Sequence, residues 1–179
     1  GKEVAFHETY KEFLGKEVAR EFTPDLDALD IARLDLPDQD LLFSDEEIWA
    51  VIRNMPADRA PGPDGFIGLF FQKAWAIIKV DVIAALHKLF IGNGRGFGRL
   101  NQTLITLIPK TPEASTTLDY RPISLEHSLP KIASKLLANR LSPRMGELVH
   151  INQSIFIKGR SIHDNFMYVR NFAGRLQKR

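Results

Sequence analysis

The chain has 179 residues, of which 44% are hydrophobic and 26% are charged, a balance typical of a globular domain rather than a disordered segment. No apolar run approaches the roughly 18 residues that a membrane-spanning helix needs, and the first residues lack the pattern of a signal peptide. The chain contains no Cys, which excludes disulfides and thiolate metal sites and fits a reducing compartment. We therefore expect an intracellular protein, nuclear or cytoplasmic, without membrane contact.

Charge is distributed unevenly along the chain, although the net charge is only +2. Residues 1–65 hold 7 Lys and Arg against 16 Asp and Glu, whereas residues 121–179 hold 11 against 3. A basic segment of this kind can contact phosphates. It can equally be the solvated surface of helices, and charge alone leaves both interpretations open.

The first predicted unit, residues 1–43, is an acidic helical extension with a linker. Phe6, Tyr10 and Leu14 recur at helical spacing, which predicts a helix over residues 4–14. Residues 23–40 are acidic, contain two prolines and show no periodicity, so we expect a solvated connector there.

The second predicted unit, residues 44–100, is helical. Ser44 and Glu47 form a capping-box pattern, which predicts a helix that ends near Asn54. The apolar spacing over residues 66–90 predicts two further helices with a break near residues 79–81. A glycine-rich connector over residues 91–98 then leads out of this unit.

Between the helices of this unit, residues 59–65 read R-A-P-G-P-D-G. Two prolines fix φ and two glycines permit positive φ, so the chain has to turn here in a defined shape. Asp64 has the chemistry of a metal ligand. An Asp between Pro and Gly is far more often a turn former, and we expect that role.

The third predicted unit, residues 101–179, opens with a β-hairpin. Its strands are residues 103–109 and 121–125, and the polar residues 111–119 form the loop between them. Lys110 and Arg121 flank this loop.

The chain beyond the hairpin is predicted to be mainly helical. Pro130 marks the start of a helix, because proline is favoured in the first turn. Residues 154–158 alternate polar and apolar side chains, as a short strand does, and Gly159 with Arg160 makes the turn that follows. An apolar stripe predicts a last helix over residues 162–176.

Generic enzyme motifs are missing from the sequence, and the five His residues are scattered, so we expect each His to be structural. What remains is a set of basic side chains at turns: Lys110, Arg121, Lys158 and Arg160. Such residues beside glycines suit phosphate contacts, because a guanidinium binds phosphate oxygens bidentately and glycine lets a backbone approach.

Five motifs in order carry a resemblance to a known family. They are R-A-P-G-P-D-G-F at 59–66, L-I-T-L-I-P-K at 104–110, D-Y-R-P-I-S-L at 119–125, K-I-A-S-K-L-L-A-N-R-L at 131–141, and Q-S-I-F-I-K-G-R-S-I-H-D-N at 153–165. This series resembles the reverse transcriptase of plant non-LTR retrotransposons of the long interspersed type. The resemblance covers roughly residues 44–179.

The resemblance implies an α+β fold, mostly helical with a small antiparallel β-hairpin, as part of a right-hand polymerase. Residues 44–100 would be the N-terminal extension, and residues 101–179 would be the fingers, cut before the catalytic strand of the palm. The palm and the thumb would be absent. The implied parent activity is RNA-directed DNA synthesis, with an RNA template, a DNA primer and incoming deoxynucleotides as partners.

The same resemblance implies roles for individual residues. Lys110 and Arg121 would bind the nucleotide triphosphate, and the template or primer path would be lined by Gln153, Lys158, Gly159 and Arg160. The palm aspartates that hold two Mg²⁺ ions in this family lie outside the present residues. We therefore expect no catalytic or metal-ligating residue here, Mg²⁺ only in the full-length parent enzyme, and no polymerisation by this chain alone.

Two other functions remain open from the sequence. The basic C-terminal third is compatible with a non-catalytic nucleic-acid-binding remnant. A helical protein-interaction fragment, whose charges only solvate its surface, is the simpler alternative.

Overall fold

The computed structural model describes residues 2–15, 22–23, 25, 35–37, 40–92, 97–150, 153–154 and 156–176. These residues form an α+β fold that is mostly helical and contains one antiparallel sheet of two strands, which confirms the predicted fold class. Among the described helices, none is both long enough and apolar enough to cross a membrane.

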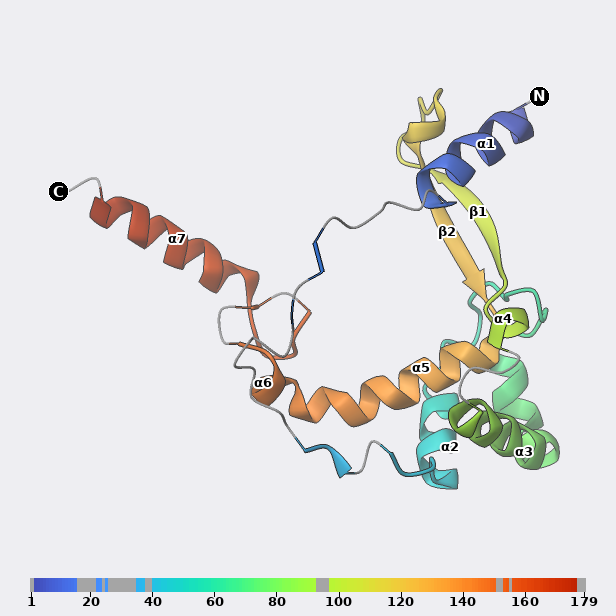
Figure 1. Cartoon of the computed structure of the whole chain (residues 1–179). Coiled ribbons are helices and arrows are strands. Elements are labelled where there is room, and N and C mark those ends of the chain that lie inside the picture. Colours follow the sequence, from blue (N-terminus) through green and yellow to red (C-terminus); the bar gives the residue numbers. More distant parts are fainter. Residues whose placement is uncertain are drawn as a thin grey trace.

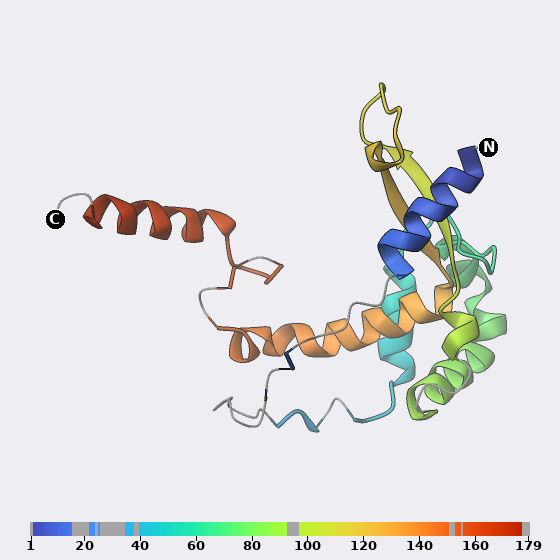
Figure 2. The ribbon, with the colours of Figure 1, turned by 45° about the horizontal axis from the view of Figure 1, so that its top comes forward.

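The elements follow one another as helices interrupted by a single hairpin. In chain order they are α1 (Lys2–Gly15), α2 (Asp45–Arg53), α3 (Gly68–Ile91), α4 (Phe97–Leu100), β1 (Thr103–Pro109), the 3₁₀ turn η2 (Thr117–Asp119), β2 (Tyr120–Glu126), α5 (Ser128–Leu141), the 3₁₀ turn η3 (Ser142–Arg144), α6 (Met145–Leu148) and α7 (Ile162–Leu176). Helix α5 connects the two ends of this arrangement: the hairpin rises from its N-terminal end, and α6 and α7 follow its C-terminal end (Figures 1 and 2).

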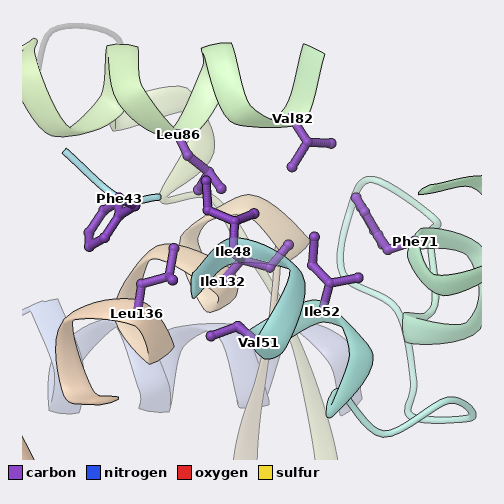
Figure 3. Packing of buried hydrophobic residues seen from close by; sticks show 9 residues of the cluster. All are labelled: Phe43, Ile48, Val51, Ile52, Phe71, Val82, Leu86, Ile132 and Leu136. Atoms are coloured by element: carbon purple, nitrogen blue, oxygen red, sulfur yellow. The ribbon is translucent and has the colours of Figure 1, made fainter. Parts of the chain in front are cut away.

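The hydrophobic core lies where α2, α3 and α5 meet (Figure 3). Its buried side chains are Phe43, Ile48, Val51, Ile52, Phe71, Val82, Leu86, Ile132 and Leu136. The rings of Trp49 and Trp75 stack at its edge with a centroid distance of 5.3 Å. Helix α5 therefore belongs to the core through one face and carries the hairpin at its start.

Helix α2 begins with the predicted capping box. The Ser44 hydroxyl accepts a hydrogen bond from the Glu47 amide at 3.2 Å, and the Glu47 carboxylate accepts one from the Ser44 amide at 2.8 Å. These two bonds satisfy amides that the helix itself leaves without partners. The helix ends at Arg53, with Asn54 as its C-cap, as the sequence predicts.

The turn over residues 59–65 fastens the start of α5. The Asp64 carboxylate accepts hydrogen bonds from the Phe66 amide at 3.3 Å and from the Ser128 amide at 2.5 Å. Gly65 has a φ of 75°, and a Cβ at Gly62 would overlap the carbonyl oxygen of Glu126. Asp64 is thus a turn former, as expected, and the turn packs against the junction of β2 and α5.

Two sequence predictions about secondary structure are wrong. Helix α3 runs unbroken through residues 79–81, because that stretch holds no Gly or Pro and because Val82, directly after it, is buried in the core. The predicted strand over residues 154–158 is a turn in its described part. Phe156 has a φ of 63°, and the Arg160 amide bonds to the Ile157 carbonyl at 3.1 Å, so the chain curls there.

The other predicted elements are confirmed where the structure describes them. They include α1, the hairpin, α5 and α7, whose N-terminal Ser161 hydroxyl accepts a hydrogen bond from the His163 amide at 3.2 Å. Most of the predicted connector over residues 23–40, and residues 93–96 of the glycine-rich connector, lie outside the described residues. The glycine-rich connector is shorter than predicted, because α3 extends to Ile91 and α4 begins at Phe97.

Candidate functional site

The register of the hairpin decides where its basic side chains lie. Ile108 pairs with Arg121, and the Lys110 amide continues the ladder with a 2.8 Å hydrogen bond to the Asp119 carbonyl. Opposed residues share a face of the sheet, and every second residue of a strand returns to that face. Lys110 and Arg121 therefore lie on the same face, together with Ile108.

Helix α1 lies against part of the opposite face of the hairpin. The ring of Phe6 meets the ring of Tyr120 edge to face at 5.1 Å, and the Tyr10 hydroxyl donates to the Tyr120 carbonyl at 3.2 Å. A cavity of about 490 Å³ separates α1 from Ile105 and Leu107 of the same face. Helix α1 therefore lies over part of this face (Figure 2), on which Ile105 is still 50% exposed.

The face with the two cations is open. Arg121 and Lys110 are exposed, and so are Leu104, Ile108 and Ile123, which are 54%, 48% and 39% exposed. A guanidinium and an ammonium thus stand at the edge of an exposed apolar strip. This arrangement can receive an anionic group that is attached to a flat or apolar one.

The loop between the strands is ordered by its own polar side chains. The Asp119 carboxylate accepts hydrogen bonds from the Thr116 amide at 2.8 Å, the Thr116 hydroxyl at 2.9 Å and the Ser115 amide at 3.1 Å. The bonds from Thr116, then that from Ser115, lower the pKa of Asp119, and the charge of Lys110 adds to this effect. The Lys110 ammonium donates to the Leu118 carbonyl at 2.6 Å, which joins the two sides of the loop at its base.

Asp119 is a loop-ordering residue that is not among the site residues predicted from the sequence. The available signal was the pattern T-x-x-D over residues 116–119, which is the same type of capping box that predicts the start of α2.

The second predicted basic set lies in the turn over residues 153–160. The Arg160 guanidinium donates to the carbonyls of His150 and Gln153 at 2.7 Å each and of Val149 at 3.0 Å. Gly159 has a φ of 83°, which glycine adopts without strain. Arg160 and Gly159 therefore shape the turn, while Lys158 and Gln153 are exposed on it.

The structure does not bring the two predicted sets together. Lys110 and Arg121 belong to the hairpin at the N-terminal end of α5, and the turn over residues 153–160 follows its C-terminal end (Figure 1). Each set must therefore contact a different ligand group, or different parts of one long ligand.

Two His side chains take structural positions in the described part of the chain. The His87 Nε2 atom lies 2.8 Å from the Phe43 carbonyl oxygen, and His127 lies 3.8 Å from the Asp64 carboxylate. Within the described residues, no group of three or more His, Asp or Glu is arranged to hold a metal ion.

Comparison with known proteins gives one informative match. No protein-family model matches this chain. The chain is 30% identical over 126 residues to the transposon TX1 uncharacterized 149 kDa protein of Xenopus laevis. The aligned part covers 70% of this chain and 10% of that protein, so the chain spans about a tenth of the length of its relative. The similarity relates the chain to a transposon protein.

Proposed function

We propose that this chain is part of the RNA-directed DNA polymerase of a non-LTR retrotransposon, and that the β1–β2 hairpin contacts the triphosphate of the incoming deoxynucleotide. The five motifs and the similarity to a transposon protein support the family. The observation that carries the site is the common open face of Lys110 and Arg121, opposite the face against which α1 lies.

The chemistry of the two cations suits a triphosphate. The Arg121 guanidinium offers a planar fork of donors that matches phosphate oxygens. The Lys110 ammonium has three donors, of which the Leu118 carbonyl takes one, so two remain for phosphate. Negative charge develops on phosphate oxygens during nucleotidyl transfer, and cations held in place beforehand stabilise it. Mg²⁺ would accompany the nucleotide in the parent enzyme.

The turn over residues 153–160 is the proposed contact with the RNA template or the DNA primer. Lys158 and Gln153 are the exposed polar side chains that would meet the sugar-phosphate backbone. Gly159 and Arg160 act on this contact by holding the shape of the turn, because Arg160 binds three carbonyls there. Replacing Arg160 would therefore change the turn as well as the charge, whereas Lys158→Ala changes the charge with little effect on the fold.

Titration of a fluorescent deoxynucleoside triphosphate into the 179-residue chain tests the hairpin site. Arg121→Ala should weaken binding about tenfold, equivalent to about 1.4 kcal/mol, and Lys110→Ala should also weaken it. Arg121→Lys should recover only part of the loss, because an ammonium lacks the guanidinium fork. Arg53→Ala is the matched control, since it removes one exposed cation from α2, outside the hairpin.

Two results would count against the proposal. One is triphosphate affinity that does not change in Arg121→Ala. The other is an equal loss in Arg53→Ala, which would show a response to net charge and not to a site.

A further inference from the structure

A cavity beside helix α3 is not used by the proposed function. Its volume of about 390 Å³ lies within the range of about 300 to 1,000 Å³ that is typical of small-molecule sites. Its walls come from the R-A-P-G-P-D-G turn and the residue after it, from α3, from Leu100 of α4, and from His127 and Leu129 at the start of α5. We call this space the α3 cavity. Segments that are distant in the sequence thus meet around it.

Three phenylalanines give the α3 cavity most of its apolar surface. The rings of Phe66 and Phe70 stack with a centroid distance of 4.3 Å, and the Phe71 ring meets the Phe70 ring edge to face at 5.3 Å. Phe71 belongs to the core, whereas Phe66 and Phe70 are 45% and 37% exposed. A buried ring therefore supports two rings that a ligand can reach. Aromatic faces attract cations as well as apolar groups.

The charged groups that line the cavity are acidic. Asp64 and Asp81 line it, and no described Lys or Arg does. The Asp64 carboxylate is already occupied, because it accepts hydrogen bonds from two backbone amides. His127, the other titratable group of the lining, lies 3.8 Å from the same carboxylate and pairs with it when protonated.

Asp81 is the carboxylate that remains for a ligand. It is exposed, and among the described residues it has no ion pair and no side-chain hydrogen bond. The positions three and four residues away on α3 hold only Ile and Ala, so the helix itself offers no cation to Asp81. An unbalanced carboxylate thus stands beside the aromatic rings.

We propose that the α3 cavity binds a small organic cation, in which an aromatic or branched apolar group carries an ammonium. The apolar group lies against the three phenylalanine rings, and the ammonium pairs with Asp81. The two carboxylates disfavour an anion, and the volume is that of a small-molecule site. Neither Lys110 nor Arg121 lines the cavity, so this site is independent of the proposed triphosphate contact.

Titration of naphthylethylamine into the isotope-labelled 179-residue chain, followed by NMR, tests the cavity. Backbone amide signals around the cavity, such as those of Asp81 and Leu129, should shift. Naphthylethanol is the matched neutral probe, because it keeps the ring and lacks the cation. It should bind about fivefold more weakly, and naphthylacetate, an anion, should bind more weakly still.

Charge variants at Asp81 test the ion pair. Asp81→Asn should weaken naphthylethylamine binding about threefold and leave naphthylethanol binding unchanged, because an exposed ion pair contributes little but only the amine can form it. Asp81→Lys should reverse the preference, so that naphthylacetate binds more tightly than the amine. Glu113→Gln is the matched control, since it removes an exposed carboxylate from the hairpin loop, outside the cavity.

A steric variant tests the cavity itself. Ala85→Leu places three more carbon atoms in the lining and should weaken both the amine and the alcohol. Ala84→Leu adds the same atoms at an exposed position of α3 that does not line the cavity, and should change neither affinity.

Four results would overturn the proposal. They are equal affinity of the wild-type chain for amine and alcohol, the same amine affinity in Asp81→Asn as in Glu113→Gln, unchanged affinities in Ala85→Leu, and tighter binding of a short peptide in which Phe precedes Lys. The last would assign the cavity to a protein segment. Triphosphate affinity should not change in Asp81→Asn, so failure of this site and failure of the hairpin site appear in different titrations.

Discussion

Arg140 donates two hydrogen bonds to the Glu47 carboxylate, from Nε to Oε1 at 2.7 Å and from NH2 to Oε2 at 2.8 Å. The same carboxylate closes the capping box of α2 by accepting from the Ser44 amide. Arg140 also lies over the ring of Phe43, 4.4 Å from its centroid, and donates to the carbonyls of Leu41 and Leu42. One ion pair thus joins the end of α5, the start of α2 and the chain that enters it.

Glu47→Gln should remove the ion pair with Arg140 and keep the helix cap, so it measures the two contributions separately. Glutamine still closes a capping box but cannot pair with Arg140, so we expect a loss of about 2 kcal/mol in the free energy of unfolding, discounted for the partial exposure of Glu47. Glu47→Ala should cost about 1 kcal/mol more, because the cap is lost too. Urea unfolding followed by circular dichroism measures both. Glu46→Gln, on the exposed face of the same turn, should change little, and an equal loss in it would refute the role of the pair.

The pair also predicts how stability depends on pH. The side-chain hydrogen bond from Arg140, with help from Ser44, lowers the pKa of Glu47 from 4.5 to about 2. A carboxyl with a lowered pKa in the folded state contributes its full stabilisation above the unfolded pKa and loses it as pH falls. The wild-type chain should therefore lose stability between about pH 4.5 and pH 2 more steeply than Glu47→Gln. The prediction is contradicted if the free energy of unfolding depends on pH in the same way in the wild-type chain and in Glu47→Gln.

Gly62→Ala tests the packing of the R-A-P-G-P-D-G turn. A Cβ at this position would overlap the Glu126 carbonyl, and neither partner is a flexible side chain, so the turn or the β2–α5 junction must shift. We expect a loss of about 3 kcal/mol in the free energy of unfolding. Gly146→Ala is the control, since a Cβ there meets nothing within 4 Å and alanine favours the helical conformation of α6. Equal stability of the two variants would show that the turn does not pack as described.

Asp119→Ala should loosen the hairpin loop. The amides of Ser115 and Thr116 lose their acceptor and should exchange hydrogen faster. The Leu118 carbonyl, which accepts the hydrogen bond from the Lys110 ammonium, should become more mobile. Triphosphate affinity should fall although a negative charge has been removed. Glu113→Ala removes an exposed negative charge from the same loop and should leave affinity the same or raise it. A rise in affinity in Asp119→Ala would mean that charge outweighs loop order.

Much of the local structure could be predicted because it depends on residues a few positions apart. The capping box of Ser44 and Glu47, the turn around Asp64 and the hairpin are each specified by neighbours in the sequence. The unbroken α3 and the turn in place of a strand at residues 154–158 could not be predicted in the same way. Helix α3 continues because Val82 is buried in the core. The turn at residues 154–158 is accompanied by contacts of Arg160 with carbonyls up to 11 residues away.

The sequence by itself determined that Lys110 and Arg121 flank one loop of a hairpin, because strand propensity and turn residues are local properties. Only the tertiary structure decided which face of the hairpin is open, since that depends on α1, which docks on Tyr120 from more than 100 residues away. The same holds for Arg140, whose carboxylate partner is 93 positions distant. Contacts of this range follow from burial of apolar surface in the whole chain, and no short pattern encodes them.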